Sequence, residues 1–230
     1  MADFKIDAQC KDTSARSGTL VINDKIVKTP VFMPVGTYGA VKGLMTSEIQ
    51  NIGFNLILAN TYHMFLRPGV DVLKKSKGLH EFMNWDGLIL TDSGGFQIYS
   101  LKGLRKIEND GASFQSHLNG DKHKLTPESV IDIQRIIGSD IMMMLDVCPS
   151  GAGQINEWDD AVKLTSKWAQ IAHNYYNSTK GYYNKEQLLV PIVQGGTNLQ
   201  LREKSAFDLQ KLESSIYAIG GLAVGEPKDK

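Results

Sequence analysis

Two aspartates stand directly after short apolar runs, where a carboxylate could act at the end of a buried strand. Asp92 follows GLILT and precedes Ser93 and two glycines, and Asp146 follows DIMMML. The glycines of TDSGG allow backbone N–H groups to approach a ligand that side chains would exclude. Two carboxylates in one site suit glycosidic-bond chemistry, in which one handles protons and another attacks or stabilises an oxocarbenium-like centre. TDSGG alone is equally compatible with a turn that starts a helix, and Asp146 with a satisfied structural carboxylate.

Gln194 and the Gly220–Gly221 pair add hydrogen-bonding groups later in the chain. A carboxamide both donates and accepts, and a glycine backbone lets a flat ligand come close. These groups suit a heterocyclic base, which makes a nucleobase a candidate ligand. Gln194 is also compatible with a turn residue, because two glycines follow it.

The segments that position these residues alternate between strand and helix. Apolar, strand-like runs occupy residues 18–24, 29–36, 55–60, 87–91, 140–146, 187–194 and 215–221, and helical patterns occupy 47–52, 69–77, 126–138, 164–175 and 201–212.

Local signals refine three of these segments. Thr126 as N-cap, Pro127 at the first position and Gly138 at the end predict the helix most clearly. Ser47 and Gln50 have capping-box spacing at the start of the first helix. Residues 103–125 are expected to form a polar hairpin insertion that turns at Asn119-Gly120.

Continuous apolar strands that alternate with helices predict an α/β fold with a parallel sheet covered by helices. Polar or glycine residues follow five different strands at the same edge: Asn60, Asp92, Asp146, Gln194 and Gly220-Gly221. An open doubly wound sheet concentrates ligand residues at one switch point, whereas a (β/α)8 TIM barrel gathers all its strand ends around one site. The barrel is therefore favoured. Because a complete barrel takes about 250 residues, residues 1–230 are expected to be the N-terminal part of a single catalytic barrel, incomplete at the C-terminus.

Composition adds little about partners. The 25 basic residues balance the 25 acidic residues, so any nucleic-acid surface must be local. Cys10 and Cys148 are far apart, without a CxxC pair, which is typical of reduced thiols. The N-terminus has no apolar signal region, and no stretch reaches the roughly 18 apolar residues of a membrane span. A cytoplasmic protein is expected.

Six motifs give the chain a family resemblance. It resembles the tRNA-guanine transglycosylases in TPVFMPVGTYGAVKGL, LANTYHMFLRPG, FMNWDGLILTDSGGFQ, GSDIMMMLDVC, VPIVQGG and YAIGGLAVGE. The resemblance implies a (β/α)8 barrel with a zinc-binding subdomain inserted near its C-terminal end. It also implies exchange of guanine for a 7-deazaguanine at the wobble position of tRNA with a GUN anticodon, in queuosine biosynthesis.

The resemblance also implies roles for the site residues. Asp92 would be the acid/base carboxylate. The pocket would be shaped by Ser93, Gly94, Gly95 and Phe96, with Phe96 stacking on the base. Asp146 and Gln194 would read the polar edge of the base, and Gly221 would contribute a backbone contact. The family's attacking aspartate and its zinc ligands, three cysteines and one histidine, would lie beyond the last residue of this chain. His63, in the NTYH motif, is interpreted as structural support.

The motifs favour preQ1 over queuine as the incoming base. LAVGE and Cys148 resemble the bacterial enzymes, which insert preQ1, whereas Val147 departs from their usual Asp-Glu-Cys and weakens that assignment. Cys148 is interpreted as a residue that lines the pocket rather than as a nucleophile.

Two other functions stay open. A non-catalytic member of the family would bind base or tRNA without exchange, as a homodimer or a heteromeric subunit. A barrel glycoside hydrolase would use similar carboxylates, but such sites usually present aromatic platforms, and the tryptophans are only Trp85, Trp158 and Trp168. Candidate RNA contacts in the insertion, equally compatible with a solvated polar surface, are Lys102, Arg105, Lys106, Lys122 and Lys124.

Overall fold

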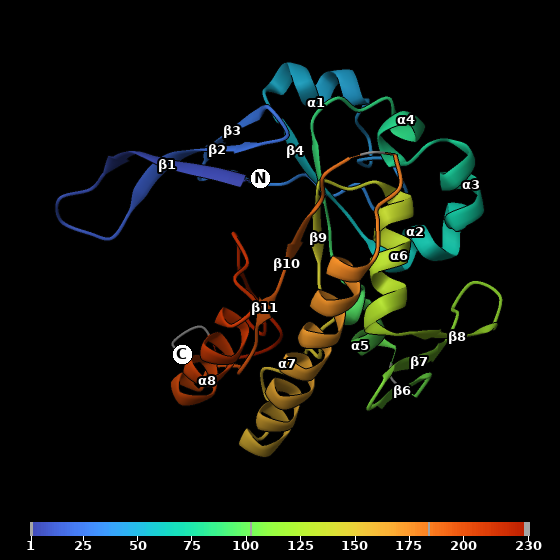
Figure 1. The fold of residues 1–230 in the computed structure, drawn as a ribbon, viewed down its shortest axis with the longest axis vertical. Helices are drawn as coiled ribbons and strands as arrows, with labels where there is room; N and C mark the ends of the chain where they lie inside the picture. The colour runs from blue at the N-terminus through green and yellow to red at the C-terminus, as the bar shows by residue number, and fades with distance from the viewer. Residues whose placement is uncertain (1, 102, 184, 228–230) are drawn as a thin grey trace.

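The computed structural model describes residues 2–101, 103–183 and 185–227. It begins with an antiparallel meander of β1 (Ala2–Gln9), β2 (Arg16–Ile22) and β3 (Lys25–Thr29), which projects from the rest of the chain (Figure 1). Asn23 and Asp24 join β2 to β3 with positive φ angles of 50° and 62°. A two-residue turn of this kind suits Asn and Asp, which tolerate the left-handed region. The strand β1 has no counterpart in the sequence-based prediction.

A parallel sheet forms the centre of the structure. Its strands are β4 (Leu56–Ala59), β5 (Leu88–Thr91), β9 (Ile141–Met143) and β10 (Leu188–Val190), in the order β10-β9-β5-β4. Next in the chain, β11 (Ile192–Val193) pairs in parallel with β12 (Ala218–Ile219). The spatial order follows the chain without the reversal of a doubly wound sheet. The α/β prediction with a parallel sheet is confirmed, and the described strands form an open, singly wound array.

Helices cover this sheet and connect its strands. They are α1 (Thr46–Ile52), α2 (Thr61–Met64) with η1 (Phe65–Gly69), α3 (Val70–Lys75), α4 (Leu79–Met83), α5 (Gly95–Ser100), α6 (Pro127–Ile137), α7 (Ile155–Ser178) and α8 (Leu199–Gln210). Figure 1 shows α6 and α7 beside the sheet. As predicted, the Thr126 hydroxyl accepts the Ser129 N–H at 3.1 Å and left-handed Gly138 ends α6.

The insertion between α5 and α6 is a three-stranded antiparallel meander, not the predicted hairpin. It consists of β6 (Arg105–Glu108), β7 (Gly111–Gln115) and β8 (Lys122–Leu125). The predicted Asn119-Gly120 turn joins β7 to β8, and Gly120 has a φ of 79°. The prediction missed the first strand, because Asn109-Asp110 forms a second tight turn.

Proline explains two further differences from the sequence prediction. In the predicted strand at 29–36, Thr29 ends β3 and Val35 forms a bridge to Leu58. Pro191 separates β10 from β11. Proline has no N–H to donate to a strand ladder. The predicted Ser47/Gln50 capping box is also wrong: α1 begins one residue earlier, and the Glu48 carboxylate accepts the Met45 N–H at 2.7 Å.

A buried ion cluster closes the end of the sheet opposite the candidate site. The Asp140 carboxylate, fully buried, accepts the Ile89 N–H at 2.8 Å and contacts Lys185 Nζ at 2.8 Å and His80 Nε2 at 3.1 Å. It also accepts the Asn23 side-chain N–H at 3.1 Å. These contacts hold the N-terminal meander, α4 and the central strands together. The His80 and Lys185 contacts lower the pKa of Asp140 despite its burial.

Candidate active site

Side chains that follow the strands β4, β5, β9 and β11 form two groups. Asn60, after β4, donates to Asp92 Oδ2 at 2.6 Å. Ser93, after β5, donates to Asp146 Oδ1 at 2.6 Å, and Gln194, after β11, donates to Asp146 Oδ2 at 2.7 Å. The prediction that these residues meet at one edge of the sheet is confirmed. Their packing follows from the parallel register, which brings all carboxyl ends to the same edge.

Four donors hold the Asp92 carboxylate in one orientation. The backbone N–H groups of Thr61 and Gly94 donate to Oδ1 at 2.8 and 3.2 Å. The side chains of Asn60 and Gln97 donate to Oδ2 at 2.6 and 3.0 Å. Burial raises the pKa of Asp92 above its usual value, and these donors oppose that rise. A carboxyl with a raised pKa in a fixed position can exchange a proton with a bound molecule.

Asp146 lies deeper in the same site. Burial raises its pKa as well, and hydrogen bonds from Ser93 and Gln194 partly offset the effect. Gly95 packs directly against it: a Cβ at this position would lie 2.6 Å from the Asp146 carbonyl oxygen and 2.7 Å from Oδ1. Only glycine therefore fits between the start of α5 and this carboxylate.

A pocket of about 250 Å³, here called the base pocket after the nucleobase that the sequence predicts as its ligand, lies between these groups. Every site residue predicted from the sequence lines it except Gly95, and its walls include Asp92, Ser93, Gly94, Phe96, Asp146, Gln194 and Gly221. Phe96 is 52% exposed. Gly221 has a φ of 68°, and a Cβ there would lie 2.5 Å from Gln194 Oε1.

Gln194 Oε1 is buried without a hydrogen-bond partner among the described residues. A buried acceptor left unsatisfied costs free energy that a donating ligand would recover. Because an N–H of the Gln194 carboxamide is engaged by Asp146, the oxygen is the group of this side chain left to accept an N–H.

Gln97 is a contact of Asp92 that the sequence reasoning did not identify. It stands five residues after Asp92, and the first turn of α5 returns its side chain to the carboxylate. Its Oε1 also lacks a partner among the described residues. Only its place in the TDSGGFQ motif could have indicated it.

Cys148 lines the base pocket, as expected. It is buried, and this burial raises the pKa of its thiol to about 12, with a smaller contribution from the nearby Asp146 charge. Such a thiol is a poor nucleophile near neutral pH, because the thiolate is the reactive species.

His63 lies outside the lining of the base pocket. Its ring packs edge-on against Tyr38 and Tyr62, with centroid distances of 5.1 and 5.2 Å. This position fits structural support of α2.

Of the candidate RNA contacts, Lys102 lies outside the described residues. Lys106 pairs with Glu108 at 3.0 Å, and Lys124 with Asp110 at 2.8 Å, so nearby carboxylates offset both charges. Arg105 has no such partner in the described part of the chain, and its guanidinium lies over the Tyr99 ring.

The tryptophans offer no platform at the base pocket. Trp85 and Trp168 are fully buried in the core, and Trp158 packs beside Gly196. Sugar-binding sites usually present several exposed aromatic rings, and the tryptophans add none to Phe96 in this lining.

Residues 2–101, 103–183 and 185–227 offer neither a metal-binding cluster nor a helix that could span a membrane. Their His, Cys, Asp and Glu side chains form no group of three that could hold a metal ion. The zinc ligands that the resemblance implies are therefore not found among these residues. Across the same residues, each helix is too short or too polar to cross a bilayer.

Comparison with known proteins gives consistent matches along the chain. The family described as "Queuine tRNA-ribosyltransferase" matches residues 10–230. Proteins of that name from Solibacter usitatus and Bacillus subtilis are 46% and 49% identical to it over 226 residues, which is 98% of this chain and 60% and 58% of theirs. The one from Thermoanaerobacter pseudethanolicus is 48% identical over 231 residues, covering 100% of this chain and 60% of its own. The chain thus spans about 60% of the length of these relatives, and it belongs to the queuine tRNA-ribosyltransferase family.

Proposed function

We propose that the protein is a tRNA-guanine transglycosylase, a pentosyltransferase that exchanges guanine at the wobble position of GUN-anticodon tRNA for a 7-deazaguanine. The observation that carries this proposal is the Ser93–Asp146–Gln194 group, which ends in an unpartnered acceptor inside the base pocket. Family membership supports the reaction class. We also propose that the parallel strands are the first part of a (β/α)8 barrel.

Asp146 and Gln194 read the polar edge of the base. Guanine presents an N1–H and an exocyclic amine as donors beside a carbonyl acceptor. Asp146 has lone pairs left after it accepts from Ser93 and Gln194, and Gln194 Oε1 needs a donor. The Gly220–Gly221 backbone lets the flat base approach, and Phe96 stacks on its face.

Asp92 is the acid/base carboxylate at the other side of the base pocket. Its four donors set its position, and burial keeps its pKa raised, so it can deliver a proton to the leaving base and take one from the incoming base. Asn60 and Gln97 are positioning residues that act through Asp92.

The exchange proceeds by two displacements at C1′. A carboxylate attacks the ribose as guanine leaves, and the incoming base then displaces that carboxylate with overall retention. The family resemblance assigns the attack to an aspartate other than Asp92. We propose preQ1 rather than queuine as the incoming base, because Cys148 and the LAVGE segment resemble the bacterial enzymes.

The test is incorporation of radiolabelled guanine into unmodified GUN-anticodon tRNA, with calorimetric binding of guanine measured in parallel. Asp92→Ala is compared with Asp71→Ala, which removes an exposed carboxylate on α3. Incorporation that is lost in Asp92→Ala and kept in Asp71→Ala supports the proposal. Binding of guanine or tRNA by folded protein without exchange favours the non-catalytic alternative. A folded protein that binds neither refutes both.

A further inference from the structure

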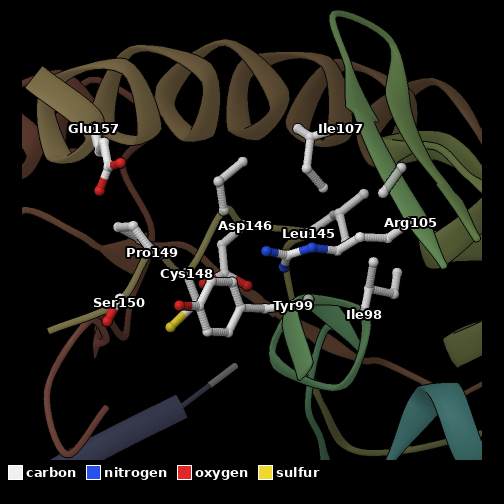
Figure 2. Close-up of a pocket in the computed structure, with 13 residues that line it drawn as sticks. Ile98, Tyr99, Arg105, Ile107, Leu145, Asp146, Cys148, Pro149, Ser150 and Glu157 are labelled. Atoms are coloured by element: carbon white, nitrogen blue, oxygen red, sulfur yellow. The ribbon is translucent and has the colours of Figure 1, made fainter. Parts of the chain in front are cut away.

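A second cavity, here called the side cavity, borders the base pocket. Its volume is about 350 Å³, and it shares Asp146 and Cys148 with the base pocket. Figure 2 shows it between α5, the β6–β8 meander and the segment that leads into α7. None of the roles assigned above uses this space.

Arg105 supplies the positive charge of the side cavity. Its guanidinium carbon lies 4.3 Å from the centroid of the Tyr99 ring, and its side chain is half-buried. Within the described residues it forms no ion pair, unlike the neighbouring Lys106 and Lys124. An arginine that contacts an aromatic ring and forms no ion pair has N–H donors left for another group, and a guanidinium suits a phosphate.

Apolar side chains and the carboxylate of Glu157 form further parts of the side cavity lining. Ile98, Ile107 and Leu145 contribute apolar surface on which a base or ribose can pack. Glu157 lies away from Arg105 in Figure 2. Asp146, the other carboxylate of the lining, accepts hydrogen bonds from Ser93 and Gln194. The positive charge of Arg105 is therefore the group of this lining that attracts a phosphate, away from Glu157.

We propose that the side cavity binds a nucleotide that neighbours the exchanged base in the RNA strand, with its phosphate on Arg105. The shared wall at Asp146 places it next to the base pocket. Arg105 also lines a groove with Lys122 and His123, which lets the strand continue over β6–β8. The inference rests on the proposed function, and a free nucleotide has the same chemistry.

The experiment measures binding of a fluorescein-labelled GUN-anticodon stem-loop RNA across a salt series, and of GMP and guanine by calorimetry. Arg105→Ala is compared with Arg16→Ala, which removes the same charge from the exposed N-terminal meander. We expect Arg105→Ala to weaken RNA binding by at least about fivefold and to make the salt slope shallower by about one. Guanine binding stays at the wild-type value in both variants.

Each arm has an outcome that would overturn the inference. Equal RNA affinities for Arg105→Ala and Arg16→Ala would remove Arg105 from RNA binding. GMP binding that depends on Arg105, with unchanged RNA affinity, would assign the cavity to a free nucleotide. Wild-type protein that binds guanine but not the stem-loop would overturn the inference without contradicting guanine binding in the base pocket. Wild-type protein that fails to bind guanine would count against the proposed function. Melting temperatures verify folding, and Arg105→Gln, which keeps part of the stem over Tyr99, replaces an unstable Arg105→Ala.

Discussion

Adding one methyl group at Gly95 should displace the Asp146 carboxylate, which we propose reads the base. In Gly95→Ala the new Cβ would lie 2.6 Å from the Asp146 carbonyl oxygen and 2.7 Å from Oδ1, whereas ordinary contact begins at 3.4 Å. Both obstacles belong to a segment fixed by the Ser93 and Gln194 hydrogen bonds. The start of α5 and Asp146 must therefore move apart by most of an ångström.

The cost of this movement follows from overpacking. Crowding one methyl group into a packed interior costs roughly 1–3 kcal/mol, and a shift of that size at a binding group lowers exchange about a hundredfold. The matched control is Gly36→Ala, at another buried glycine, where the Cβ meets its neighbours at an ordinary 3.6 Å. Urea unfolding, guanine calorimetry and guanine exchange are measured on both variants. Gly95→Ala as stable and as active as Gly36→Ala would refute the steric reasoning.

Three further predictions concern stability and reactivity. Asp140→Asn should lower the free energy of unfolding by about 3 kcal/mol near pH 7, because it breaks a buried pair with Lys185. Since the native pKa of Asp140 is depressed, this stabilisation is present above about pH 4 and is lost as the pH falls below that value. Urea titrations in which the difference in unfolding free energy between wild type and variant does not narrow from pH 7 to pH 3 would contradict this account. Iodoacetamide at pH 8 should alkylate exposed Cys10 long before buried Cys148, whose thiol pKa is about 12; intact mass with peptide mapping measures this, and equal rates would exclude the buried position. Thr126→Ala should cost about 1 kcal/mol by removing the N-cap of α6, and an unchanged urea midpoint would mean that the cap contributes nothing.

Local signals account for the parts of the fold that the sequence predicts well. Thr126, Pro127 and Gly138 determine where α6 starts and stops, because caps and proline act within one turn of the chain. The incorrect strand predictions have local causes too. Pro191 divides a run of apolar residues, predicted as one strand, into β10 and β11. Two successive tight turns fold the 103–125 insertion into three strands. A pattern of apolar residues does not indicate where proline removes the backbone N–H donor that a strand needs.

The sequence alone determined which residues could do the chemistry, because Asp92, Asp146 and Gln194 each follow an apolar run and the carboxyl ends of parallel strands share one edge. The tertiary structure decided how they act on one another. Gln97 reaches Asp92, Gly95 touches Asp146, and Arg105 lies on Tyr99 only because the turns and helices between them pack as they do. Such contacts depend on distances between side chains that the linear order does not specify. For this reason the sequence could indicate the base pocket, but only the packed structure could show the side cavity beside it.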